Sequence, residues 1–150
     1  MKKLILIICL LLFIMPVSAN AKINVHLFYS ESCPHCHDEI DFLKEYQLEN
    51  DQFEIILYEV SEKDNEKLMM DAKKAFQNND SYVPFTVIGL KSFTGFNTNI
   101  KEELKLTINY YLENEYRDLV SEIEAGTFLP GIHQFTPDIF ENEQITIPVI

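Results

Sequence analysis

Apolar and polar residues repeat along the chain with two different periods, one typical of strands and the other typical of helices. Residues 23–30 and 53–60 are short runs rich in β-branched and aromatic side chains, which is typical of largely buried strands. Between them, from residue 33 to about residue 48, apolar side chains recur at helical spacing. The order of strand, helix and strand predicts a βαβ unit, whose crossover is almost always right-handed.

The apolar stripe in residues 33–48 predicts which side chains of this helix face the core. The expected inner positions are Cys36, Ile40, Leu43, Tyr46 and Leu48. The charged positions, which we expect to lie mostly off the stripe, are Asp38, Glu39, Asp41, Lys44 and Glu45. The helix should therefore bury one face and expose the other to water.

A second helix is predicted after the strand at 53–60. Ser61 or Asp64 is suited to cap it, because a short oxygen-bearing side chain can accept a hydrogen bond from the free N–H groups of a helix start. Its apolar positions are Leu68, Met69, Ala72, Ala75 and Phe76. The polar run at 78–81 should end this helix.

A hairpin and a third helix are predicted in the next part of the chain. Residues 82–88 and 92–96 are short β-prone runs on either side of a glycine-containing turn, which is the pattern of a hairpin. Thr98 or Asn99 can cap a helix over residues 100–114.

The first 21 residues have the layout of a signal peptide. Lys2 and Lys3 precede an unbroken apolar run at 4–15, and small residues suit cleavage after Ala21. An uncleaved membrane anchor is the alternative, although the run is shorter than the roughly 20 residues that a full span prefers. In both cases we expect an exported, extracytoplasmic domain, and in the second a membrane-anchored one.

The predicted organisation therefore has three parts. A signal peptide occupies residues 1–21, and one globular domain occupies residues 22–114. A less regular C-terminal extension follows at 115–150, where Gly and Pro interrupt any pattern. A chain of 150 residues can hold one domain with a proper core, and not comfortably two.

The net charge of the chain argues against nucleic acid as a partner. The sequence has 24 acidic and 12 basic side chains, a net charge of −12. Removal of residues 1–21 takes away two lysines and no acid, which brings the net charge near −14. We therefore expect no nucleic-acid partner, because binding to phosphates calls for a basic surface.

The candidate chemistry lies in the two cysteines that remain after cleavage, Cys33 and Cys36. Two cysteines are too few for a disulfide scaffold, and C-x-x-C spacing fits a redox pair. The free N–H groups and positive dipole end of the predicted helix favour a thiolate on Cys33, and the thiolate is the species that attacks disulfides. We expect Cys33 to be the nucleophile and Cys36 to be the resolving cysteine.

The two residues between the cysteines should tune the pair. Pro34 suits the first helical position, where its missing N–H costs nothing. His35, when protonated, adds a positive charge next to the thiolate. Both residues should favour the reduced form, and a more stable reduced form means a more oxidising couple.

Val83 and Pro84 open the predicted hairpin and have two interpretations. A proline at the edge of a strand is common and needs no functional reason. The alternative is a cis Val83–Pro84 bond that faces the cysteines, exposes the Val83 backbone to a substrate strand and keeps metals away from the thiols. Because the C-x-x-C pair lies upstream, we expect the cis bond and a substrate-binding role for both residues.

The chain resembles the thioredoxin/glutaredoxin family in its order of elements, with C-x-x-C at a strand-to-helix turn and a later Val-Pro before a hairpin. This resemblance covers about residues 22–114 and implies a four-stranded mixed sheet flanked by helices. The dipeptide Pro34-His35 resembles that of DsbA-type oxidants. The resemblance implies an oxidoreductase that exchanges disulfides with protein partners and needs no dissociable cofactor or metal.

Four further stretches resemble a particular bacterial group, in which an exported glutaredoxin-like domain precedes a polytopic domain similar to the cytochrome c biogenesis and DsbD-type thiol transporters. These stretches lie at 83–89, 93–96, 110–120 and 147–150. The resemblance implies a transmembrane thiol transporter as a partner or as a fused domain. The extension at 115–150 would then be a linker to the membrane domain.

The sequence departs from the family pattern at one position with chemical importance. Thioredoxins and DsbA-type proteins usually carry a buried acid six residues before the first cysteine, where this chain has Leu27. A proton acceptor for Cys36 is therefore not obvious. His26 is adjacent, but strand alternation should point it to the opposite face. The charges with which the family binds glutathione are not recognisable either.

Two other functions use the same residues. Cys33 to His37 also spells C-x-x-C-H, the attachment motif of c-type haem, with His37 as the axial ligand. A zinc or copper site could be built from Cys33, Cys36, His35 and His37. The strands on both sides of the motif disfavour a largely helical haem domain, and a single C-x-x-C is only half of a structural zinc site. The expected function is thus a thiol:disulfide oxidoreductase.

Overall fold

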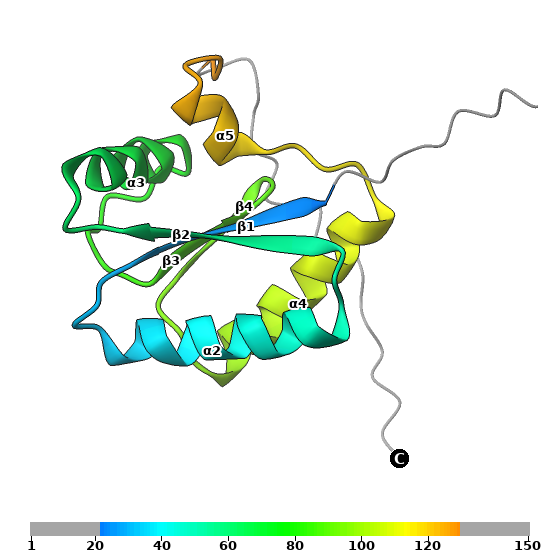
Figure 1. The fold of residues 1–150 in the computed structure, drawn as a ribbon. Helices are drawn as coiled ribbons and strands as arrows, with labels where there is room; N and C mark the ends of the chain where they lie inside the picture. The colour runs from blue at the N-terminus through cyan, green and yellow to red at the C-terminus, as the bar shows by residue number, and fades with distance from the viewer. Residues whose placement is uncertain (1–21, 130–150) are drawn as a thin grey trace, which may run out of the picture.

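A central sheet with helices on both faces makes up the described part of the protein, residues 22–129 of a computed structural model (Figure 1). The predictions for residues 1–21 and 130–150 fall outside this part. In chain order the elements are β1 (Ile23–Tyr29), α2 (Pro34–Glu49), β2 (Phe53–Glu59), α3 (Lys63–Ala75), β3 (Phe85–Ile88), β4 (Lys91–Thr94), α4 (Thr98–Glu113) and α5 (Leu119–Glu124).

The four strands form a mixed sheet in the order β2-β1-β3-β4. The α2 crossover makes β1 and β2 parallel, with Leu27 paired to Leu57. Strand β3 runs antiparallel to β1, so that Leu27 also pairs with Thr86, and β4 completes the hairpin. The predicted strands, the βαβ unit and the four-stranded mixed sheet flanked by helices are confirmed.

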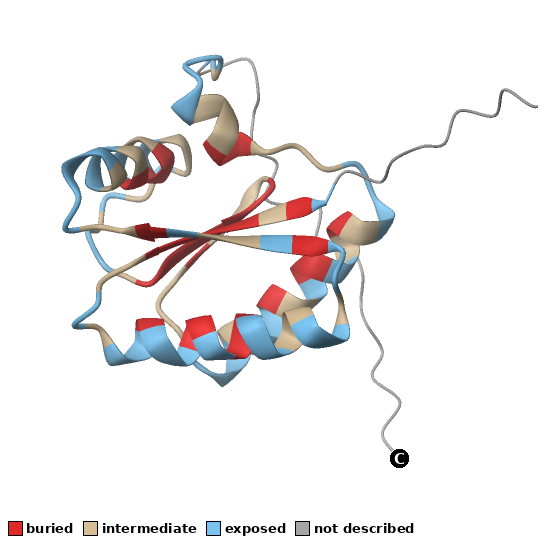
Figure 2. Ribbon diagram, viewed as in Figure 1, coloured by how far each residue is buried: buried red, intermediate tan, exposed pale blue. Residues whose placement is uncertain are grey.

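Two cores lie on opposite faces of the sheet, because successive strand residues point to opposite sides. Helices α2 and α4 cover one face, and α3 and α5 cover the other (Figure 1). Val25 and Leu27 of β1 belong to the first core, and Phe28 belongs to the second. Figure 2 shows the buried residues gathered on the strands and on the inward sides of the helices.

The observed N-caps of α3 and α4 differ from the predicted ones. The cap of α3 is Glu62, which makes no side-chain capping bond. The predicted cap Ser61 lies one residue earlier, where its N–H and hydroxyl both donate to the Glu59 carboxylate. The cap of α4 is Asn97, whose Oδ1 accepts hydrogen bonds from the backbone N–H groups of residues 99 and 100. The predicted caps Ser61, Asp64, Thr98 and Asn99 were therefore wrong by one or two positions.

The segment after α4 is tied to β1 by polar contacts. The Tyr116 hydroxyl donates to the carbonyl of Asn24 and accepts from its N–H, at 3.0 and 3.1 Å. The Asp118 carboxylate accepts hydrogen bonds from the Asn24 amide at 2.7 Å and from His26 Nε2 at 2.9 Å. Burial alone would raise the pKa of Asp118, but these bonds and one from Ser121 hold it well below its usual range.

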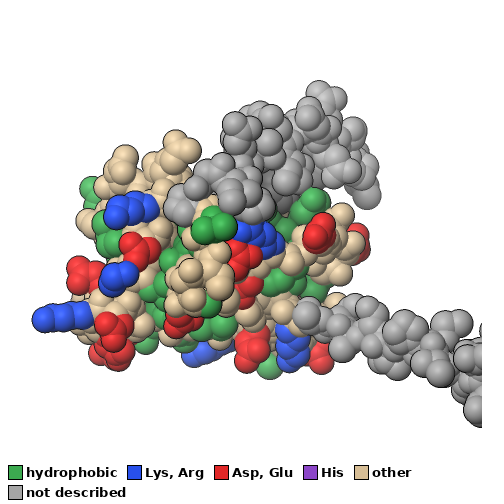
Figure 3. All heavy atoms as spheres, turned by 90° about the horizontal axis from the view of Figure 1, so that it is seen from above, with side chains coloured by type: hydrophobic (Ala, Val, Ile, Leu, Met, Phe, Trp, Pro, Cys, Tyr) green, Lys and Arg blue, Asp and Glu red, His purple; other side chains and the backbone are tan. Residues whose placement is uncertain are grey.

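The side chain of His26 lies on the α3/α5 face, where Nδ1 is 3.1 Å from the Tyr58 hydroxyl. The prediction that it points away from the side of Leu27 is confirmed. Figure 3 shows the α3/α5 side with acidic, basic and apolar side chains interspersed on its coloured surface. Within residues 22–129, none of the helices combines the length and apolarity needed to cross a bilayer.

We predict that Gly89→Ala destabilises the protein more than Gly95→Ala. Both glycines have positive φ, +58° and +79°, so each alanine costs about 1 kcal/mol of backbone strain. At Gly89 the new Cβ would also lie 2.5 Å from Tyr111 Cζ, whereas nothing lies within 4 Å at Gly95. We expect a total loss of roughly 2–4 kcal/mol for Gly89→Ala in denaturant unfolding. Equal losses for the two variants would show that the Tyr111 contact does not limit this turn.

Candidate active site

The two cysteines form a disulfide at the point where β1 leads into α2. Cys33 is the N-cap of α2 and Cys36 lies in its first turn, with their Cα atoms 5.3 Å apart. The backbone N–H of Cys36 donates to Cys33 Sγ at 3.2 Å. Pro34 stands at the start of the helix, as predicted, where the free N–H groups point toward the cysteines.

The two sulfur-bearing residues differ in exposure. Cys33 is partly exposed, whereas Cys36 is fully buried. Another protein can therefore reach Cys33 and not Cys36. The first turn of α2 contains no acidic residue, so the dipole and the Cys36 N–H favour a negative charge on Cys33 in the reduced protein.

The loop before β3 lies against the disulfide. The Val83–Pro84 peptide bond is cis, as predicted, and the Val83 carbonyl oxygen is 3.8 Å from Cys33 Sγ. Pro84 is buried and Val83 is partly exposed. The fold thus brings together Cys33, Cys36, Val83 and Pro84, which are far apart in the sequence.

A buried lysine holds the loop that leads to Val83. The Lys73 ammonium group donates to the Tyr82 carbonyl at 2.9 Å and forms an ion pair with Asp80. It also lies 4.5 Å from the centre of the Phe85 ring. Lys73 was not among the predicted inner residues of α3, although its position four residues after the buried Met69 places it on the inner face of this helix.

The two histidines of the motif are both exposed but differ in their contacts. His35 is exposed on the first turn of α2. His37 is also exposed, and its Nε2 donates to the Glu31 carbonyl at 2.8 Å, which links α2 to the turn before Cys33. Among the residues that the structure describes, no three His, Cys, Asp or Glu side chains gather in a way that could hold a metal ion.

Glu39 was predicted among the charged positions that lie mostly off the buried stripe of α2. This prediction is wrong, because the side chain of Glu39 is fully buried. It comes three residues after Cys36 and four before Leu43, both buried, and this spacing puts it on the inner face of α2. The Thr86 hydroxyl donates to Glu39 Oε1, whereas Oε2 has no hydrogen-bond partner. Leu48, which was predicted to be inside, is 89% exposed.

The environment of Glu39 changes its acidity. Burial raises the pKa of its carboxyl to about 7, and the hydrogen bond from Thr86 acts in the opposite direction. A carboxyl with this pKa exists in both protonation states near neutral pH. It can therefore take up and release a proton under ordinary conditions.

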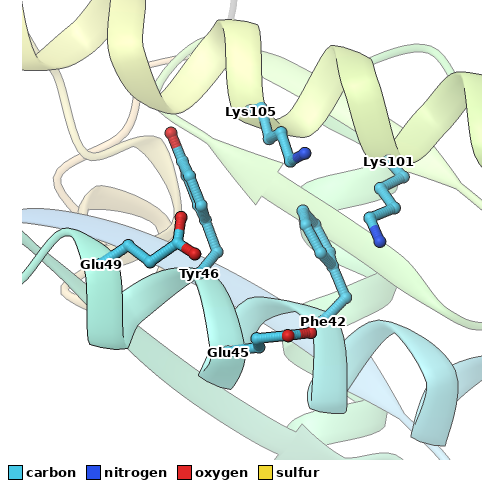
Figure 4. A pocket seen from close by; sticks show the side chains of 6 residues that line it. All are labelled: Phe42, Glu45, Tyr46, Glu49, Lys101 and Lys105. Carbon is cyan, nitrogen blue, oxygen red and sulfur yellow. The ribbon is translucent and has the colours of Figure 1, made fainter.

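A shallow pocket of about 160 Å³ lies between α2 and α4, apart from the cysteines. It is lined by Phe42, Glu45, Tyr46, Glu49, Lys101 and Lys105. In Figure 4 the two lysines reach from α4 toward the Phe42 ring, and the two glutamates come from α2. Acidic and basic groups share this small pocket, and neither sign of charge dominates it.

No family model matches the chain, and no curated protein matches it. Among solved structures it is similar to a glutaredoxin from Archaeoglobus fulgidus, with 23% identity over 56% of this chain and 84% of that chain, at a TM-score of 0.44. The likeness to a thioredoxin fold rests on the strand order and on the place of Cys33 and Cys36 at the start of α2.

We predict that the stability of the oxidised protein depends on Glu39 between about pH 4.5 and pH 7. The folded-state pKa is raised from 4.5 to about 7, so ionisation above pH 4.5 favours the unfolded chain. Stability should fall as pH rises through this window, by up to roughly 3 kcal/mol for this group. Glu39→Gln should remove this component in denaturant unfolding at several pH values. A stability difference between the two proteins that stays constant with pH would contradict the prediction.

Proposed function

We propose that this protein is an extracytoplasmic thiol:disulfide oxidoreductase that exchanges disulfides with partner proteins. The observation that carries the proposal is the Cys33–Cys36 disulfide at the N-terminus of α2, with one cysteine partly exposed and the other buried. The pair is its own redox centre, and the proposed reaction uses no dissociable cofactor or metal.

In the proposed reaction the Cys33 thiolate attacks a disulfide of the partner. A mixed disulfide forms between Cys33 and one partner sulfur, and the second partner sulfur leaves as a thiolate. Cys36 then attacks Cys33 Sγ, which forms the Cys33–Cys36 disulfide and releases the first partner sulfur. The pair loses two electrons and the partner disulfide gains them. The reverse sequence oxidises a partner dithiol.

Each neighbouring group has a role in this scheme. The N–H of Cys36 and the α2 N-terminus stabilise negative charge on Cys33 when it attacks or leaves. Pro34 starts the helix, and His35 adds positive charge when it is protonated. Val83 and Pro84 shape the groove beside Cys33, where the backbone of Val83 can pair with an extended partner segment.

The compartment and the partner are part of the proposal. The signal-peptide layout of residues 1–21 supports export, and partner proteins with disulfides occur mainly in oxidising compartments. A transmembrane thiol transporter, separate or fused, is the proposed electron partner. Pro34 and His35 favour an oxidising couple, and the potential of that partner decides in which direction exchange runs.

We predict that Cys36→Ser traps the mixed disulfide and that Cys33→Ser does not form one. With Cys36 replaced, an oxidised peptide should remain bound to Cys33 in one-to-one ratio, visible by mass spectrometry without reductant. With Cys33 replaced, the buried Cys36 should react at least ~100-fold more slowly, because a folded-state thiol without access cannot attack. Both variants should lose turnover with insulin as the disulfide substrate.

The two cysteine variants also serve as each other's control, because each removes one sulfur from the same helix turn. If Cys33→Ser captured the peptide as fast as Cys36→Ser, the assignment of nucleophile and resolving cysteine would be wrong. If neither variant formed a mixed disulfide and the wild type left insulin unreduced, the proposed function would be wrong.

A further inference from the structure

The buried face of α2 carries an acidic side chain, Glu39, whose burial does not help to stabilise the fold. Glu39 is fully buried, and an ionised carboxylate in an apolar environment is unfavourable unless all its oxygens are paired. Only Oε1 has a partner, the Thr86 hydroxyl, and Oε2 is buried with no hydrogen-bond partner. A leucine or methionine at this position would avoid that cost.

Glu39 shares its face of the helix with Cys36. Side chains three residues apart on a helix are neighbours, with Cβ atoms about 5–6 Å apart, and both of these side chains are fully buried. Thr86, which holds Oε1, lies two residues after Pro84 in the segment whose Val83 carbonyl is 3.8 Å from Cys33 Sγ. The carboxyl is therefore fixed between the cysteine helix and the strand that follows the cis-proline.

The resolving step needs a proton acceptor at this place. Cys36 attacks as a thiolate, and a fully buried thiol gives up its proton to bulk water with difficulty. We propose that the Glu39 carboxylate accepts the proton of the Cys36 thiol, directly or through one water molecule, when Cys36 resolves a mixed disulfide. This inference rests on the proposed function and adds a proton route to it.

The step balances in both directions. In resolution, the proton moves from Cys36 Sγ to Glu39, the Cys36 sulfur bonds to Cys33 Sγ, and the partner sulfur leaves with the electron pair. In the reverse direction, a partner thiolate attacks Cys33 and the Cys36 sulfur leaves as a thiolate. The protonated Glu39 then returns its proton to Cys36. The proton on Glu39 exchanges with solvent between cycles.

The acidity of Glu39 suits this role, since a pKa of about 7 lets the group act as base or acid near neutral pH. On its own helix the titratable neighbour on the same face is Cys36. Leu27 and Thr86 are paired on β1 and β3 on the side facing α2, and neither titrates. The α4 cations lie over the Phe42 ring, Lys101 at 4.8 Å and Lys105 at 5.8 Å from its centre.

The inference is tested by stopped-flow reaction of the reduced protein with dithionitrobenzoate. Attack by Cys33 releases one coloured thiolate, and resolution by Cys36 releases a second, so the two steps are separate phases. The wild-type second phase should accelerate with pH and level off above about pH 7. In Glu39→Gln it should be ~100-fold slower at pH 7 and should rise about tenfold per pH unit without levelling there. The first phase should not change.

Glu45→Gln is the matched control, because it makes the same chemical change on the exposed face of α2. Its two phases should equal those of the wild type. If Glu39→Gln matched Glu45→Gln in rate and pH dependence, the proton route would be wrong, while two phases in the wild type would still uphold disulfide exchange. If the wild type showed no second phase, both proposals would be contradicted.

Thr86→Val gives an independent readout that does not alter the carboxyl itself. The Thr86 hydroxyl lowers the pKa of Glu39, so its removal should move the wild-type inflection of the second phase to higher pH. A folded Thr86→Val protein with an unmoved inflection would contradict the assignment of that inflection to Glu39.

Discussion

The approach of the Val83 carbonyl to Cys33 Sγ, at 3.8 Å, joins two segments separated by 50 residues. Three parts of the fold maintain it. The β1–β3 pairing brings the end of one strand beside the start of the other, and the N-terminus of α2 fixes Cys33. On the other side of the loop, Lys73 holds the carbonyl of Tyr82 from within the α3 core. The site is therefore held by contacts on both sides while one sulfur-bearing residue remains partly exposed.

The two cysteines differ in burial, and the proposed reaction gives them different roles. In the proposed reaction Cys33, which is partly exposed, meets the partner, and Cys36 is enclosed by the same core that stabilises the domain. Enclosure protects the resolving thiol from unrelated reactions, but it also removes the water that would take its proton. Glu39, the one buried acid on that side among residues 22–129, has an oxygen without a hydrogen-bond partner and a pKa near neutrality. Stability and chemistry are coupled at this residue, because its ionisation disfavours the folded state.

The sequence was informative where the physical cause is local. Strand alternation, the helical stripe of α2 and the cysteine spacing predicted the strands, the helix and the pairing of Cys33 with Cys36, because each depends on neighbours in the chain. The caps of α3 and α4 were misplaced by one or two residues, because several polar residues stand next to one another at each helix start. Asn97, and not Thr98 or Asn99, accepts from the first N–H groups of α4. Glu39 and Lys73 were missed for another reason. Charged residues are ordinarily exposed, and only tertiary contacts with Thr86, Asp80 and the Tyr82 carbonyl explain their burial.

Equilibration of the intact protein with a series of thiol–disulfide buffers measures the reduction potential of the Cys33–Cys36 couple. An exchange-active pair should titrate reversibly as a two-electron couple with a midpoint between about −120 mV, as in DsbA, and about −270 mV, as in thioredoxin. A midpoint below about −300 mV, or a disulfide that does not equilibrate with the buffer, is the behaviour of a structural cross-link and would contradict the account.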